Sequence, residues 1–189
     1  MKINNENFLL FLYERTFEIL ENSGSKGWTM EDVCKAAGMS KDTLYRAVSG
    51  KEDLITRAIK FKIASHISDM KKIAGSDFEY YTRFNRMLSL LYEIIESFSS
   101  KQLQSVLKDY PITSHYTSSE FSNLLKILEL FLQEGIDEGI LRPELNPAFL
   151  AANIHYNVLY IIERENPKHY EKHIESYLDI LINGIKSIK

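Results

Sequence analysis

Residues 29–54 read TMEDVCKAAGMSKDTLYRAVSGKEDL, and this stretch organises the N-terminal part of the chain. It predicts two short helices, over 30–37 and 41–47, separated by a turn that contains Gly38. Glycine adopts a positive φ without steric cost, as a sharp chain reversal requires. Ser40 then precedes the second helix, where a serine hydroxyl can cap free backbone N–H groups. Two short helices joined in this way form a helix-turn-helix.

Other segments carry residues that are typical of helix starts. Thr29–Asp32, Ser49–Glu52 and Thr117–Glu120 have the form of a capping box, in which two side chains satisfy N–H groups of the first turn. Asn146-Pro147 and Asn166-Pro167 each offer an N-cap followed by proline at the first helical position. These signals divide the chain into helices with short connections.

Apolar residues recur at helical spacing along nearly the whole chain, most clearly over 174–185. Alternation of period two, which is typical of strands, is hard to find. The sequence therefore predicts an all-α protein, with a three-helix helix-turn-helix module at the N-terminus followed by a bundle of long helices. The nine or so expected helices cover residues 4–22, 30–37, 41–47, 51–74, 78–98, 100–108, 118–138, 147–163 and 167–187.

The charge balance does not indicate a polyanionic partner for the chain as a whole. The formal net charge is −3, and the first 55 residues hold seven Lys and Arg against nine Asp and Glu. Residues 40–51 nevertheless hold three basic residues and one acid. We therefore expect any basic contact surface to be local to the second short helix.

Several function classes find no support in the sequence. No nucleophile elbow, P-loop, HExxH motif or paired-carboxylate arrangement is present, so we expect no enzyme activity. Cys34 is the single cysteine and is interpreted as a small buried core residue. His169 and His173 lie one turn apart without a further ligand at suitable spacing, so we expect no metal site and no cofactor. No uncharged apolar run approaches about 20 residues and the start lacks a signal peptide, so we expect a cytoplasmic protein without membrane contact.

The stretch 29–54 resembles the DNA-binding signature of the TetR family of ligand-responsive transcriptional repressors. The number and lengths of the downstream helices are similar to that family as well. The resemblance implies a helix-turn-helix DNA-binding domain over 1–50, a linking helix over 51–74, and a ligand-binding and dimerisation domain over 75–189. It implies a homodimer that binds palindromic double-stranded operator DNA and is released by a small-molecule effector.

The resemblance also assigns roles within the N-terminal module. The helix over 41–47 would enter the major groove, with Lys41, Thr43 and Arg46 near base edges or phosphates. Tyr45 matches a tyrosine that in this family reaches a backbone phosphate, and Lys51 would hold a phosphate at the start of the linking helix. The candidate DNA-binding residues are Thr29, Ser40, Lys41, Thr43, Tyr45, Arg46 and Lys51.

The aromatic C-terminal region is where the resemblance implies an effector pocket and a subunit interface. Asp109–Ser119, with its proline and polar residues, is predicted to be a loop near the mouth of that pocket. The candidate pocket residues are Tyr81, Phe84, Leu88, Tyr92, Tyr110, Tyr116, Leu125, Asn153, Tyr156 and Tyr160. The candidate interface residues, on the last two helices, are Ala151, Ile154, Val158, Ile161, Ile174, Tyr177, Leu178, Leu181, Ile182 and Ile185. An alternative reading is that this apolar seam closes the core of the monomer.

Two alternatives to a DNA-binding regulator stay open at this point. One is a TetR-like ligand-binding or protein-interaction module without specific DNA binding. It is suggested by the acidic N-terminal region and by Val48, where the family usually has an aromatic residue. The other is a small helical enzyme, which predicts turnover of whatever the cavity holds.

Overall fold

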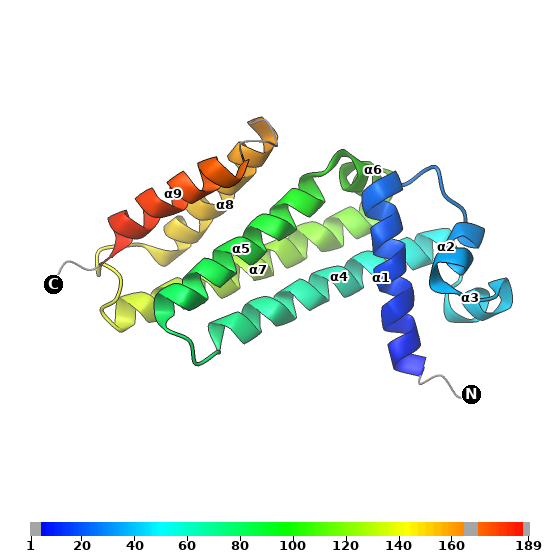
Figure 1. Ribbon diagram of the computed structural model, residues 1–189, viewed down its shortest axis with the longest axis horizontal. Coiled ribbons are helices and arrows are strands. Elements are labelled where there is room, and N and C mark those ends of the chain that lie inside the picture. The colour runs from blue at the N-terminus through cyan, green and yellow to red at the C-terminus, as the bar shows by residue number, and fades with distance from the viewer. Residues whose placement is uncertain (1–4, 165–169, 187–189) are drawn as a thin grey trace. The chain divides into compact units, whose positions relative to one another are not determined.

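The computed structural model describes residues 5–164 and 170–186, and all the helices and strands assigned within these ranges are α-helices (Figure 1). An isolated β-bridge between Leu141 and Lys186 adds the only strand-like pairing in the same ranges. The prediction of an all-α fold of about nine helices is confirmed. The helices are α1 Asn5–Ser23, α2 Met30–Ala37, α3 Lys41–Ala47, α4 Lys51–Ala74, α5 Tyr80–Ser99, α6 Lys101–Asp109, α7 Pro111–Asp137, α8 Pro147–Arg164 and α9 Tyr170–Ile185.

Two of the expected N-caps are present at the helix starts. Thr29 forms the predicted capping box, because its hydroxyl accepts from the Asp32 N–H while the Asp32 carboxylate accepts from the Thr29 N–H. Asn146 Oδ1 accepts from the Phe149 N–H at 2.9 Å, as expected for the cap of α8. The expected cap at Asn166-Pro167 lies outside the described residues.

Two of the expected capping boxes are wrong. At the start of α4 the Ser49 N–H donates to the carboxylate of Asp53, not to that of Glu52. Thr117 lies inside α7, where its hydroxyl donates to the Thr113 carbonyl at 2.8 Å. A Thr-x-x-Glu pattern is short enough to occur inside a helix by chance, because threonine can bond the preceding turn instead of capping.

The predicted loop over Asp109–Ser119 is also wrong, because α7 begins at Pro111. Proline suits the first position of a helix, where its missing N–H has no partner to lose. Two polar residues of this segment, Thr113 and Thr117, are buried rather than solvated. Thr113 Oγ1 shares a hydrogen bond of 2.9 Å with Thr56 Oγ1 of α4, so a tertiary contact supports these helical turns.

The chain divides into two compact units. Unit 1 comprises the residues up to His66 together with Ser100–Glu120, and unit 2 comprises Ile67–Ser99 and the residues from Phe121 onward. Helix α6 and the first turns of α7 therefore group with the N-terminal helices, whereas the sequence-based division into 1–50, 51–74 and 75–189 put them in the C-terminal part.

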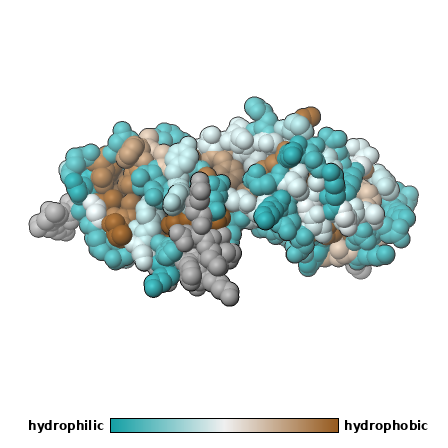
Figure 2. All heavy atoms as spheres, turned by 90° about the horizontal axis from the view of Figure 1, so that it is seen from above, coloured by the Kyte–Doolittle hydropathy of each residue, from teal (hydrophilic) through white to brown (hydrophobic). Residues whose placement is uncertain are grey.

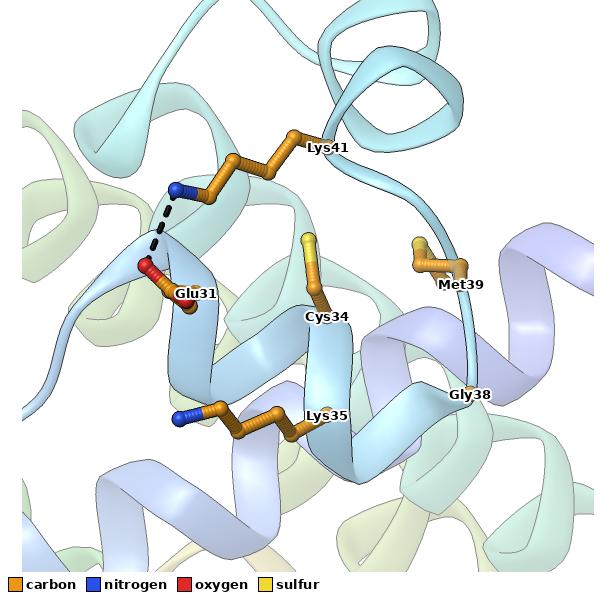
Figure 3. Close-up of a pocket in the computed structure, with 6 residues that line it drawn as sticks. All are labelled: Glu31, Cys34, Lys35, Gly38, Met39 and Lys41. Carbon is orange, nitrogen blue, oxygen red and sulfur yellow. Dashed lines mark ion pairs between the residues drawn. The ribbon is translucent and has the colours of Figure 1, made fainter.

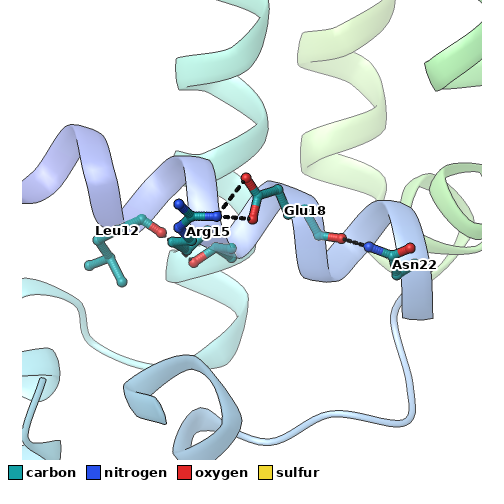
Figure 4. Close-up of polar contacts among 5 residues, drawn as sticks. Leu12, Arg15, Glu18 and Asn22 are labelled. Carbon is teal, nitrogen blue, oxygen red and sulfur yellow. Dashed lines mark hydrogen bonds and ion pairs between the residues drawn. The ribbon is translucent and has the colours of Figure 1, made fainter. Parts of the chain in front are cut away.

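Unit 1 is built around α1, which contacts both α2 and α6 (Figure 1). Leu12 and Leu20 of α1 are completely buried, as is Leu44 of α3. Each such leucine contributes about 1.5–3 kcal/mol relative to an exposed side chain. The exposed side of α1 carries an ion pair between Arg15 and Glu18 that spans one turn (Figure 4).

The loop after α1 is bonded to α6. Ser25 Oγ donates to Asp109 Oδ2 at 2.6 Å, and this hydrogen bond holds the pKa of Asp109 below its usual range. Gly24 has φ 67°, and a Cβ there would lie 2.5 Å from Ser105 Oγ. Both the left-handed backbone and the close approach of α6 require glycine at this position.

Unit 2 contains a stack of aromatic rings between α5 and α7. The rings of Tyr80 and Phe131 lie parallel with centroids 4.6 Å apart, and Phe84 extends the stack. Arg83 covers its edge, donating to Glu134 Oε1 at 2.7 Å and to the Ala74 carbonyl at 2.6 Å. Stacking and burial together favour a fixed arrangement of these three rings.

Helix α8 contacts both α5 and α9 within unit 2. Its inward face carries Ala151, Ile154 and Val158, all of them buried. A helix turns 100° per residue, so side chains two positions away from this stripe point outward.

None of the helices that the structure describes has the length and apolar character needed to cross a membrane.

Candidate nucleic-acid interface

The turn between α2 and α3 has the geometry that the sequence predicted. Gly38 lies in the left-handed region with φ 62°, and the Met39 N–H donates to the Cys34 carbonyl at 2.9 Å. Ser40 caps α3, since its hydroxyl oxygen accepts from the Thr43 N–H at 3.1 Å. These bonds end one helix and begin the next within three residues, so the angle between α2 and α3 is set locally.

Buried side chains fix the orientation of α3 against the rest of unit 1. Val33 and Leu44 are completely buried, and Val48 just after α3 is 3% exposed. Cys34 is buried too, which confirms its interpretation as a core residue. The helix is therefore held by its inner face, and its outer face is free to meet a partner.

Five of the seven candidate DNA-binding residues lie together on or just before α3. Tyr45 is 54% exposed although it is a large aromatic residue, and its neighbours on the helix surface are polar. A helix with its side chains is about 10–12 Å across, which matches the major groove of B-DNA. The exposed candidates of this group are Ser40, Lys41, Thr43, Tyr45 and Arg46. The sixth, Thr29, is exposed at the start of α2, where its side chain is engaged in the capping box.

Both basic side chains of α3 are paired with carboxylates. Lys41 Nζ lies 2.9 Å from Glu31 Oε2 of α2, and Arg46 Nη2 lies 2.8 Å from Asp42 Oδ2 of its own helix. All four side chains are more than half exposed. The sequence already put Asp42 one turn before Arg46, but the pairing of Lys41 with Glu31 of another helix is visible only in the structure.

An open hollow of about 360 Å³ separates the two helices on this side (Figure 3). Lys41 reaches across it toward Glu31, above the thiol of Cys34. The hollow is lined by Glu31, Cys34, Lys35, Gly38, Met39 and Lys41. Met39, in the turn between the two helices, lies at the rim of this hollow.

Lys51, the seventh candidate, is engaged with a residue that the sequence did not single out. Its Nζ donates to the Trp28 carbonyl at 2.8 Å and lies 3.9 Å from the centroid of the Trp28 ring. Burial lowers the pKa of Lys51. Trp28 is itself buried, with its indole N–H bonded to the Gly24 carbonyl. The signal available in the sequence was that the only tryptophan of the chain directly precedes the cap at Thr29.

Replacing Lys51 by methionine should lower the stability of the protein by about 1–2 kcal/mol, because a cation–π contact and a charge-assisted hydrogen bond are lost. Intrinsic tryptophan fluorescence measures the effect directly, since Trp28 is the only tryptophan. Urea unfolding followed by this signal should shift to lower midpoint. Lys72→Met, which breaks an exposed pair with Asp69 on the same helix, is the control and should change the midpoint less. An unchanged midpoint in Lys51→Met would show that the contact with Trp28 does not stabilise the fold, and phosphate binding would remain the only role predicted for Lys51.

The residues expected to line an effector pocket fall into both units. Tyr110 and Tyr116 belong to unit 1, and the Tyr116 ring lies under Lys60 Nζ at 4.8 Å. In unit 2 the side chains of Phe84 and Leu88 are packed in the core. The other candidates in unit 2 are Tyr81, Tyr92, Leu125, Asn153, Tyr156 and Tyr160.

Two of these candidates are corrected by their exposure. Tyr156 and Tyr160 are 66% and 61% exposed, so they do not line an enclosed cavity of this chain. Both lie on the outer face of α8, opposite the stripe of Ala151, Ile154 and Val158. By contrast Asn153 accepts a hydrogen bond from the Tyr177 hydroxyl of α9 at 3.0 Å, inside unit 2.

The expected subunit interface is corrected in the same way. Five of its ten residues are already buried in the single chain and have little area left for a partner: Ala151, Ile154, Val158, Leu181 and Ile185. They pack where α8 meets its neighbours in unit 2, so this part of the seam closes the core of the monomer. The other five keep partial exposure: Ile161, Ile174, Tyr177, Leu178 and Ile182.

Unit 2 also holds a polar group that the sequence reasoning missed. His155 lies on α8 with its ring 6.4 Å from that of Phe121, and burial lowers its pKa. Its Nδ1 is buried without a hydrogen-bond partner among the residues that the structure describes. The available signal was a histidine directly after Ile154, within a predicted helix that also carries apolar residues at core spacing. Within the described ranges, no three acidic, histidine or cysteine side chains are grouped to hold a metal ion.

Comparison with known proteins gives evidence that is independent of this geometry. Residues 12–58 match the family described as bacterial regulatory proteins, tetR family. No curated protein matches the chain.

Solved structures share the fold over nearly its full length. The TetR transcriptional regulator SCO0520 from Streptomyces coelicolor is 14% identical with a TM-score of 0.74, over 95% of this chain and 98% of that chain. The reduced form of Escherichia coli NemR is 16% identical with a TM-score of 0.74, over 96% and 100%. FadR from Bacillus subtilis in complex with stearoyl-CoA is 17% identical with a TM-score of 0.64, over 93% and 98%.

Proposed function

We propose that the chain, whose residues 12–58 match the tetR family of bacterial regulatory proteins, is a transcriptional repressor that binds palindromic operator DNA as a homodimer and leaves it when a small molecule binds. One observation carries the proposal. The capped helix α3 is anchored by the buried Leu44 while it presents Lys41, Thr43, Tyr45 and Arg46 to solvent. Such a helix can place its polar side chains at base edges and phosphates of one major groove.

Exposed apolar side chains on α8 and α9 support a homodimer. Tyr156, Tyr160 and Ile180 are each more than 60% exposed, and Phe149 at the start of α8 is 72% exposed. Figure 2 shows apolar side chains at the surface of the end of the chain that carries these helices. Leaving large apolar groups in water is unfavourable, and a second subunit would cover them. Two subunits also present two reading helices, as a palindrome needs.

We propose that the effector binds in unit 2 among α5, α7 and α8. The ring of Phe121 lies 6.4 Å from that of His155 and supplies apolar surface there, and the buried Nδ1 of His155 offers a hydrogen bond to a polar group of the ligand. A ligand that fits only the conformation unable to span two half-sites would lower operator affinity by differential binding. Regulation of this kind needs only binding of DNA and ligand, so we propose no catalysed reaction. We also propose that the protein acts in the cytoplasm, where the DNA is.

A TetR-like module without specific DNA binding is the competing proposal. The observation in its favour is that both bases of α3 are neutralised, Lys41 by Glu31 and Arg46 by Asp42. Exposed ion pairs are weak, however, and the dense charge of DNA competes well with single carboxylates.

Selection of binding sites from random duplex DNA at about 100 mM salt separates the two proposals. The wild type should enrich a palindrome whose half-sites are about one helical turn apart. A Lys41→Ala, Arg46→Ala double variant should enrich nothing, and its circular dichroism should match the wild type because both side chains are exposed. No enrichment by the wild type, even at lower salt, would reject operator binding.

A further inference from the structure

The ion pair between Glu31 and Lys41 differs from most exposed pairs of the chain because it joins two helices. Lys41 Nζ lies 2.9 Å from Glu31 Oε2, and the two residues come from α3 and α2. The Arg46–Asp42 pair, by contrast, links successive turns of α3. In Figure 3 the Lys41 side chain extends from the start of α3 over the hollow to Glu31. Lys41 is therefore drawn toward α2, along the surface of unit 1.

The chemistry of the two groups agrees with a formed pair. The hydrogen bond and charge of Lys41 lower the pKa of Glu31, and the same contact raises the pKa of Lys41. Both side chains are still more than half exposed, 61% for Lys41 and 53% for Glu31. Water and salt screen such a pair strongly, so it can open without large cost when a stronger anion approaches.

Glu31 is not needed for the cap of α2. The reciprocal hydrogen bonds of the capping box run between Thr29 and Asp32, and Glu31 takes no part in them. As an acid in the first turn, Glu31 adds only a modest favourable interaction with the helix dipole. Because Glu31 lies next to α3, we expect its removal to change DNA binding more than the stability of the fold.

We propose that Glu31 competes with a DNA phosphate for the Lys41 ammonium, and so holds operator affinity below the value that the module could reach. The inference rests on the proposed function, because it concerns how α3 engages DNA. Glu31 is a positioning residue: it acts through Lys41 and does not itself contact DNA. Binding then exchanges one anion for another, with Lys41 leaving Glu31 as the phosphate arrives.

Restrained affinity suits a regulator that must be released. Coupling between two ligands of one protein commonly changes affinity by about 5- to 150-fold. An operator complex that is too tight would stay formed after a change of this size, whereas a weaker complex would dissociate. The Glu31–Lys41 pair would keep operator affinity low enough for effector binding to dissociate the complex.

A double-mutant cycle on the operator tests the proposal. Affinities of the wild type, Glu31→Gln, Lys41→Ala and the double variant are measured by fluorescence anisotropy at about 100 mM salt. Glu31→Gln should tighten binding about threefold to tenfold, and Lys41→Ala should weaken it. In the Lys41→Ala background the gain from Glu31→Gln should fall below about 1.5-fold, because no lysine remains to be freed.

Asp69→Asn is the matched control. It removes the same charge from an exposed pair, with Lys72, in the second half of α4. Operator affinity should change by less than about 1.5-fold, since the substitution is not part of the reading module. A gain in Asp69→Asn equal to that in Glu31→Gln would show a general effect of net charge and would overturn the proposal.

The remaining outcomes are equally decisive. No gain in Glu31→Gln, or an equal gain with and without Lys41, overturns the role of Glu31 and leaves operator binding standing. A wild type with no operator affinity rejects the proposed function, and this inference with it. Partial unfolding cannot imitate the expected result, because a destabilised variant would bind DNA more weakly, not more tightly.

Discussion

Tyr45→Phe should weaken operator binding about tenfold to a hundredfold and leave thermal unfolding unchanged, since a hydrogen bond to a charged group is worth about 1.5–3 kcal/mol. Tyr45 is 54% exposed on α3, so the loss of its hydroxyl removes no packing within the chain. In the proposed complex, with α3 in the major groove, its hydroxyl would donate to a backbone phosphate. Anisotropy titrations at fixed salt give the affinity, and circular dichroism gives the unfolding temperature.

Tyr92→Phe makes the same chemical change in unit 2 and serves as the control. The Tyr92 hydroxyl donates to Glu96 at 3.1 Å on the exposed side of α5, so operator affinity should stay as it is in the wild type. A loss of less than twofold in Tyr45→Phe would place this tyrosine outside the DNA contact. Recognition would then depend on Lys41, Thr43 and Arg46.

Gly135→Ala should lower the free energy of unfolding by about 2–3 kcal/mol, although alanine is favoured over glycine by about 1 kcal/mol in a helix. A Cβ at this position would overlap Tyr80 Oη and Cζ and lie 2.8 Å from Cε2. Tyr80 cannot move aside, because its ring stacks on Phe131 and meets Tyr81 edge-on. Steric overlap should therefore outweigh the gain in helix propensity, and urea unfolding measures the difference.

Gly184→Ala is the matched control in α9. A Cβ there meets no atom within 4 Å, so helix propensity acts alone. The free energy of unfolding should therefore rise by up to about 1 kcal/mol. Tyr80→Leu in the Gly135→Ala background should recover part of the loss, because the ring that blocks the Cβ is gone. If Gly135→Ala were as stable as the wild type, the tight contact between α5 and α7 would be disproved.

Local sequence signals were sufficient for most of the fold. Helices α2, α3 and α4 begin and end where the sequence predicted, because Thr29, Gly38 and Ser40 act on backbone groups within a few residues. Capping and positive φ depend on short-range geometry that the sequence states directly. The same locality explains why the exposed face of α3 could be predicted in advance.

Contacts between distant segments account for what the sequence could not show. The first turns of α7 resemble a loop in sequence because Thr113 and Thr117 are polar. In the structure Thr113 is buried against Thr56 of α4, and Thr117 bonds the Thr113 carbonyl. Lys51 stands at a helix start, as predicted, yet Trp28 determines where its ammonium lies. Glu31 and Lys41 are ten positions apart in different helices, so no periodicity linked them.

Helix α8 marks the boundary between these two kinds of information. Its apolar spacing states correctly that Ala151, Ile154 and Val158 share one face, because that follows from 100° per residue. Periodicity does not say what covers a face, and Tyr156 and Tyr160 on the opposite side are nearly as apolar. Which face meets the core depends on how α5 and α9 pack against α8, and that packing belongs to the tertiary structure alone.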